Sequence, residues 1–164
     1  MTEGLVVFGV RTPVANPREA LSELQSMARA HGGWGQLLAG DAVLGRDHLR
    51  SAHEHAIRAF DQGLNTAGSL EMEFLLYASG ERQISKAIAA AGARPGRSLV
   101  VAITGGLRVE EVLSAFRWER DDSVLEPTRA RLRAAGFSDT EVKSAGDRAF
   151  DLILERVARV DLDR

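Results

Sequence analysis

The stretch that decides the fold is NTAGSLEMEFLLYASGERQISKAIAAAG, which runs from Asn65 to Gly92. Between Leu70 and Tyr77, apolar side chains cover almost every helical face, and only Glu71 and Glu73 interrupt them. A helix with that pattern is buried on nearly all sides. Gly80 is expected to end this helix, because glycine adopts the left-handed conformation at little cost. The stretch therefore predicts a buried helix that leads into a tight corner.

The second half of the stretch predicts a shorter helix with one inward stripe. Its apolar positions fall at i, i+3, i+4 and i+7, the spacing of a single helical face, and they are Ile84, Ala87, Ile88 and Ala91. Arg82 and Lys86 are four residues apart and share another face, with Gln83 beside them. This corner is a candidate contact for an anion or a nucleic acid, although most such charged residues are simply solvated surface.

Polar residues around the first helix carry two further expectations. Asn65 or Thr66 is expected to cap its start, because a short polar side chain accepts a hydrogen bond from a free backbone N–H. Glu73, in apolar surroundings, is expected to be a buried carboxylate held by an arginine or by backbone N–H groups. Glu71 and Glu73 point to different sides of the helix, so they do not form a glycosidase-type acid/base pair.

Length and composition exclude several classes of protein. The 164 residues suit a single domain spanning 1–164, and the lack of cysteine excludes disulfides, thiolate metal sites and cysteine nucleophiles. The net charge of −2 means that nucleic-acid binding would need a local basic patch. No apolar run approaches the roughly 20 residues that span a bilayer. The N-terminus, MTEGLVVFGV, lacks the features of a signal peptide, so we expect a cytoplasmic protein.

Apolar runs outside the central stretch predict a small sheet. Leu5–Val10 and Leu99–Ile103 read as buried strands, and the second is expected to be central. Trp34–Leu38 predicts a further short strand, which Val43–Leu44 either extends or follows with another. Few strands among many helices predict a mixed α/β (α+β) fold, in which several helices pack on a small sheet.

Amphipathic helices are expected on both sides of the central stretch. One starts at Pro17 with Asn16 as its cap and Glu19 at its third position, and it ends before Gly32. The others are expected at Asp47–Gln62, Glu110–Phe116, Thr128–Ala135 and about Asp139–Val160. The last is long, begins with the capping box of Ser138 and Glu141, and has an apolar stripe wider than one interface needs. Either part of it faces a partner, or it crosses the core and is covered on two sides.

No catalytic constellation is predicted. His48, His53 and His55 share a helix, but zinc ligands on a helix need i, i+3 or i, i+4 spacing, so a metal site is not favoured. His53 lies beside the apolar stripe and is expected to be a satisfied core histidine. Gly105–Gly106 follow a strand, where phosphates can bind, but the P-loop and dinucleotide patterns are absent and a tight turn is favoured. The chain also lacks a GxSxG elbow.

Two segments together resemble a known family. HLRSAHEHAIRAF, from His48 to Phe60, and the central stretch resemble the small kinase-associated subunit of the KEOPS complex, the TPRKB family, in its archaeal form. The most specific piece is EFLLYASGERQISKAI, Glu73 to Ile88, where the family carries a nearly identical helix–SGxRQI–helix. The clear similarity covers roughly Arg46 to Thr104, and Arg117 to Ser138 is the least similar region.

The resemblance implies a non-catalytic subunit without a cofactor. Such a subunit binds the kinase-like ATPase subunit of KEOPS and recruits tRNA by its 3′ CCA end, while another subunit attaches threonylcarbamoyl to the adenosine beside the anticodon. Candidate tRNA contacts are basic or amide side chains that suit single-stranded RNA, namely Arg82, Gln83 and Lys86, extended by Arg46, Arg50 and Arg58. Candidate partner contacts are apolar residues of the last helix, namely Leu152, Ile153, Val157 and Val160.

Two other functions stay open. One is a small metal- or nucleotide-dependent enzyme that uses the histidine helix or the Gly105–Gly106 loop. The other is a purely structural subunit that binds a partner but makes no contact with RNA. The intact SGERQI segment, without a catalytic set, favours the tRNA-recruiting subunit over the enzyme, and the purely structural subunit stays open.

Overall fold

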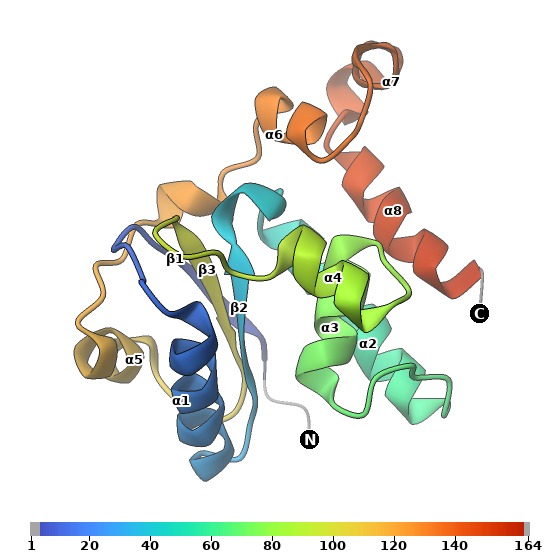
Figure 1. The fold of residues 1–164 in the computed structure, drawn as a ribbon. Helices are drawn as coiled ribbons and strands as arrows, with labels where there is room; N and C mark the ends of the chain where they lie inside the picture. The colour runs from blue at the N-terminus through green and yellow to red at the C-terminus, as the bar shows by residue number, and fades with distance from the viewer. Residues whose placement is uncertain (1–3, 163–164) are drawn as a thin grey trace.

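A computed structural model describes residues 4–162, which form a three-stranded antiparallel sheet and eight α-helices (Figure 1). The strands are β1 (Val6–Val10), β2 (Gly35–Ala39) and β3 (Leu99–Ile103), in the order β1-β3-β2. Every residue of β3 is buried, because β3 is the central strand and both of its faces are covered. The predicted mixed fold with a small sheet, and the central position of the 99–103 strand, are confirmed.

Helices cover both faces of this sheet. Because successive strand residues point to opposite faces, β3 contributes to two cores. Val101 and Ile103 join the core under α1 (Pro17–Ala30) and α5 (Val109–Phe116). Val100 and Ala102 join the core under α2 (Arg46–Asp61), α3 (Leu70–Ser79) and α4 (Ile84–Ala91). Figure 1 shows α1 and α5 on one side of the sheet and α2, α3 and α4 on the other.

The central stretch forms the predicted pair of helices, with one correction. α3 is buried along almost its whole length, and Gly80 ends it in the left-handed conformation with φ 74°. α4 touches the core only through Ala87 and Ala91. Ile84 and Ile88 are 40% and 49% exposed, so their predicted place in the inward stripe is wrong. The reason is that two alanines, one turn apart, let α4 approach the core along a narrow line that excludes its larger side chains.

Side-chain capping follows the sequence at two of the predicted helix starts, those of α1 and α7. Asn16 caps α1 by accepting a hydrogen bond from Glu19 N–H at 3.2 Å, and Ser138 with Glu141 forms the predicted capping box. The start of α3 differs, because its cap residue is Ser69, whose side chain makes no capping hydrogen bond. Instead, Glu73 Oε1 accepts from the N–H groups of the preceding loop, at residues 66 and 67, at 3.0 and 2.9 Å. The predicted Asn65 or Thr66 cap is wrong, whereas Glu73 is the predicted buried carboxylate held by backbone N–H groups.

Two elements differ from the expected ones. Residues 40–42 form a short 3₁₀ turn, η1 (Gly40–Ala42), so Val43 and Leu44 are buried in a loop and form no strand. The long last helix is broken into α7 (Asp139–Ala145), η3 (Gly146–Arg148) and α8 (Asp151–Leu162). Gly146, with φ 57° and ψ −123°, takes a conformation that does not continue a helix. The predicted single helix is therefore wrong.

The C-terminal helices form an end of the molecule away from the sheet (Figure 1). α6 (Arg129–Ala134), α7 and α8 enclose their own apolar cluster, which includes Leu132, Val142 and Ile153, and η2 (Asp122–Leu125) precedes them. α8 also packs against α2 and α3. Among the described residues, no helix is long and apolar enough to cross a membrane.

Candidate nucleic-acid interface

The α3–α4 corner, residues 79–86, is tied to α3 by hydrogen bonds and lies close to α8. Ser79 Oγ donates to Leu76 O at 2.9 Å and accepts from Glu81 N–H at 3.2 Å, which ties the corner to the last turn of α3. A side chain at Gly80 would collide with the aliphatic part of Arg156, which comes from α8. Ser79 and Gly80 are therefore required by the local fold. Ser79 forms hydrogen bonds within the corner, and Gly80 leaves room for Arg156.

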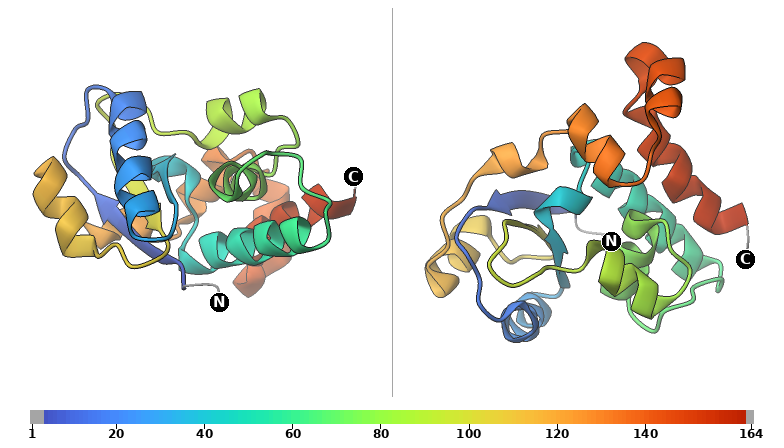
Figure 2. Two further views of the ribbon diagram at one scale, coloured as in Figure 1. Left: turned by 90° about the horizontal axis from the view of Figure 1, so that it is seen from below. Right: turned by 45° about the horizontal axis from the view of Figure 1, so that its top comes forward.

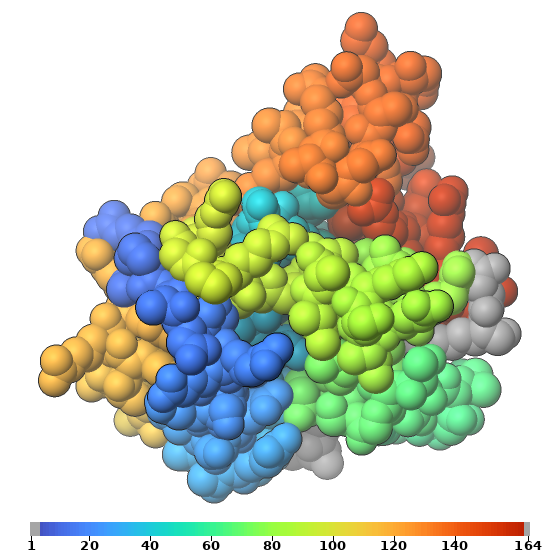
Figure 3. Space-filling view, in the orientation of Figure 1, coloured from blue at the N-terminus to red at the C-terminus, as the bar shows by residue number. Residues whose placement is uncertain are grey.

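The candidate contact side chains of the corner are exposed. Arg82, Gln83 and Lys86 are all exposed, as the sequence predicts for a contact surface. Gln83 is the cap residue of α4, and its side chain makes no capping hydrogen bond to the N–H groups at this helix start. The uncapped N–H groups and the helix dipole both attract an anion, so a phosphate is stabilised at such a helix start. In the space-filling view, α4 lies at the front surface, below α6 (Figure 3).

The exposure of Ile84 was not predicted, because its spacing places it in the apolar stripe. It is the first residue of α4 and is exposed directly after Arg82 and Gln83. An exposed apolar side chain beside cationic ones suits an unstacked base next to its phosphate. The sequence does contain a sign of this exposure, because small alanines alternate with large isoleucines along the apolar stripe of α4. A close helix contact uses the small residues and leaves the large ones at its edge.

The arginines of α2 do not extend this corner. α3 lies between α2 and α4 in both Figure 1 and the left view of Figure 2, so the two helices face different sides. Arg46 donates to Val7 O and to Asp122 Oδ2, both at 3.0 Å, and Arg50 pairs with Asp47 at 3.2 Å. Arg58 is exposed at the far end of α2, about 18 Å from Arg46 along the helix axis. The predicted continuous track is therefore wrong in its geometry.

The predicted partner residues on α8 are used within this chain. Ile153, Val157 and Val160 are buried, and Leu152 is partly buried in the cluster under α6 and α7. Their partners are α2, α3 and the short helices, because the break at residue 146 folds α8 back across the molecule. Of the two open interpretations of the last stripe, coverage on two sides holds, and the assignment of these four side chains to a partner face is wrong.

The three histidines of α2 have three different environments. His48 Nδ1 accepts from Leu44 N–H at 3.0 Å, and its Nε2 faces Ala78 O at 2.8 Å. Burial lowers the pKa of His48 to about 4. His53 is buried against the rings of Trp34 and Phe74, so its predicted place in the core is confirmed. His55 Nδ1 lies 2.6 Å from a carboxylate oxygen of α8.

Neither enzyme alternative gains a site. Within the part of the chain that the structure describes, no three histidine, aspartate or glutamate side chains gather as a metal site would need. Gly105 and Gly106 make a tight turn, with φ 84° at Gly105, and Gly106 N–H donates to His31 O at 3.0 Å. A Cβ at Gly33 would collide with the carbonyl of Thr104, so these glycines let two loops cross closely. The turn predicted from the sequence is confirmed.

Comparison with known proteins adds no family assignment. The chain matches no protein-family model, and no curated protein is a significant match. The KEOPS resemblance therefore stays a prediction.

Proposed function

We propose that this chain is a non-catalytic subunit of the KEOPS tRNA threonylcarbamoyladenosine-modification complex, which recruits tRNA through its 3′ CCA end and binds the kinase-like ATPase subunit. The observation that carries the RNA part is the uncapped start of α4 between the exposed Arg82 and Lys86 side chains. The helix start and both cations favour the same ligand, which is a backbone phosphate.

The corner suits a single-stranded end better than a duplex. The free end of an RNA can place a phosphate at the α4 start while an adjacent base lies against Ile84, and the Gln83 amide can pair with a base edge. The site is small, since α4 has only eight residues, so it fits a few nucleotides. A few nucleotides is the length of a CCA end.

Binding to the kinase-like ATPase subunit is proposed from the family resemblance alone. Because the α8 side chains are buried, a contact with that partner must use other surfaces. The corner is held by contacts with α3 and α8, so an assembled complex would receive it in a fixed orientation.

A tRNA-binding titration tests the RNA part directly. Full-length tRNA and the same tRNA without its terminal CCA are titrated at low and moderate salt. The variants are Arg82→Glu with Lys86→Glu, and a control with the same charge change on α2, Arg50→Glu with Arg58→Glu. Removing two phosphate contacts should weaken binding at least tenfold and reduce the salt slope by about 1.4 for a single strand.

Comparing the two double variants distinguishes an effect specific to the α3–α4 corner from the effect of the same charge change elsewhere on the surface. The proposal predicts that wild type and the α2 control prefer the CCA-bearing tRNA equally and that the corner variant loses this preference. Equal binding of both tRNAs by wild type, or equal losses in both double variants, would overturn the RNA part and leave a partner-binding role. Unfolding curves of each variant check that the fold is intact.

A further inference from the structure

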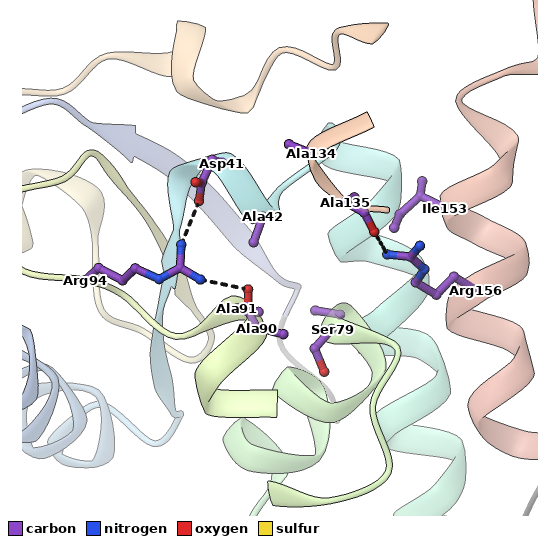
Figure 4. A pocket seen from close by; sticks show the side chains of 11 residues that line it. Asp41, Ala42, Ser79, Ala90, Ala91, Arg94, Ala134, Ala135, Ile153 and Arg156 are labelled. Atoms are coloured by element: carbon purple, nitrogen blue, oxygen red, sulfur yellow. Dashed lines mark hydrogen bonds and ion pairs between the residues drawn. The ribbon is translucent and has the colours of Figure 1, made fainter. Parts of the chain in front are cut away.

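A hollow of about 290 Å³ lies between α4, α6 and α8, beneath η1 (Figure 4). Most of its wall consists of small side chains from helix ends, among them Ser79, Ala90 and Ala134. Two arginine side chains enter it from opposite sides, Arg94 from the loop after α4 and Arg156 from α8 (Figure 4). Small-molecule sites begin at about this volume, and their orientation is fixed by a few polar groups of this kind.

Arg94 already has a partner for its charge. Its guanidinium donates to Asp41 at 3.4 Å and to Ala89 O at 3.0 Å, at the C-terminal end of α4. The pair with Asp41 is long and largely exposed, so it contributes little stability. Arg94 can therefore exchange this partner for another anion at low cost.

Arg156 differs from Arg94 in its electrostatic surroundings, because no carboxylate of the described residues lies within 4.0 Å of its guanidinium. One N–H donates to Ala135 O at 2.6 Å, and the guanidinium lies over the ring of Phe137, 4.0 Å from its centroid. Burial lowers the pKa of Arg156, against the opposite effect of Glu141 and Glu81. A half-buried cation without a counter-ion is costly, and an anion that enters the hollow would offset that cost.

We propose that this hollow binds the phosphate group of a small phosphorylated molecule of about mononucleotide size. Arg156 presents a planar fork of N–H donors that fits phosphate oxygens bidentately, and Arg94 faces it from the opposite wall. The alanine walls leave room for the organic part of the ligand. This site is separate from the outer side of the corner and does not depend on RNA binding there.

A purely structural role for Arg156 is the competing explanation. Its contacts with Ala135 O and Phe137 tie α8 to α6, and this alone would account for an arginine at that position. The two explanations differ in a measurable way, because only a binding site responds to a phosphate compound. The test must therefore read ligand binding at the hollow rather than stability alone.

Titration of the full ¹⁵N-labelled chain, followed by NMR, provides that reading. The probes are inorganic phosphate, adenosine 5′-monophosphate and, as the uncharged comparison, adenosine. Both phosphate compounds should shift the amide signals of Ala90 and Ala135, whereas adenosine should not. Arg156→Gln should weaken binding at least tenfold, and Arg159→Gln, on the same helix but outside the hollow, should change it less than twofold.

Two more variants keep the test decisive if Arg156→Gln does not fold. Arg156→Lys keeps the charge but loses the fork, so binding should weaken severalfold. Ala134 is exposed and lines the hollow, so Ala134→Leu should fold, and it should weaken the nucleotide more than inorganic phosphate by filling the space. No shift at the hollow with either phosphate compound, or unchanged affinity in both variants, overturns the proposal.

The source of the phosphate is distinguished by competition. If an RNA that ends in CCA does not displace the mononucleotide, the ligand is a free small molecule, as proposed. Displacement by the RNA would overturn the small-molecule ligand and assign the hollow to an RNA phosphate. Arg82→Glu with Lys86→Glu should leave mononucleotide binding unchanged, so that failure of tRNA binding and failure of this site are separate outcomes.

Discussion

Lowering the pH from 7 to 5 should destabilise this protein through one buried imidazole. His48 is 1% exposed, and both of its ring nitrogens have backbone partners. Nδ1 accepts from Leu44 N–H, so Nε2 carries the proton and donates to Ala78 O. A second proton on Nδ1 would face the Leu44 N–H and would place a charge in the core. This is why the pKa of His48 falls from 6.5 to about 4.

The sign and size of the effect follow from these two pKa values. Between pH 6.5 and 4 the unfolded chain binds the proton and the folded chain does not, so the free energy of unfolding falls as the pH falls. The stabilisation is fully present above pH 6.5 and is lost progressively towards pH 4. Linkage gives a loss of about 2 kcal/mol between pH 7 and pH 5. Burial also lowers the pKa of His53, which acts in the same direction.

Urea unfolding at pH 7, 6 and 5 measures this loss, and a variant isolates the share of His48. Glutamine does not titrate, so His48→Gln should have a clearly flatter pH dependence. It should also be less stable at pH 7 by about 1–3 kcal/mol, because the N–H of Leu44 loses its acceptor. The same pH dependence in His48→Gln as in wild type would refute the reasoning.

Three further substitutions test the backbone and buried charge. Gly80→Ala should cost more than 1 kcal/mol in urea unfolding, because alanine is strained at φ 74° and its Cβ collides with a side chain from α8. Gly146→Ala should cost about 1–2 kcal/mol from strain alone, since no atom lies within 4 Å of the added Cβ, and a neutral result would contradict the assigned break. Glu73→Leu should cost about 3 kcal/mol by leaving two loop N–H groups unpaired, and hydrogen exchange should show those two amides losing protection.

Features that neighbouring residues decide were predictable from the sequence. The cap at Asn16 and the capping box at Ser138 depend on side chains within three positions of the helix start, so a short pattern specifies them. The central strand at 99–103 is equally local in its signal, because five apolar residues in a row, three of them β-branched, favour a strand buried on both faces. The Gly80 corner belongs to the same class.

Features that distant segments decide were not predictable. Periodicity shows that Ile84, Ala87, Ile88 and Ala91 lie near one another on a helix, but not which of them the neighbouring helix covers. The α8 stripe suggested a partner surface because the sequence does not show that the chain turns at residue 146 and folds α8 onto α2 and α3. The hollow between Arg94 and Arg156 also depends on segments about 60 residues apart.

Some residues of the α3–α4 corner are required by the fold, whereas others are exposed and are not selected by packing. Only the second group can test whether the resemblance to a family extends to function. Ser79 and Gly80 are required by the fold of this chain, through a hydrogen bond to the loop and the space for Arg156. Any protein with this helix corner would need such residues, whatever its function. Gln83 and Lys86 are exposed at the start of α4, where packing does not select them. A substitution there that abolishes tRNA binding without changing the free energy of unfolding would therefore test the shared function, whereas a substitution at Gly80 tests only the shared fold.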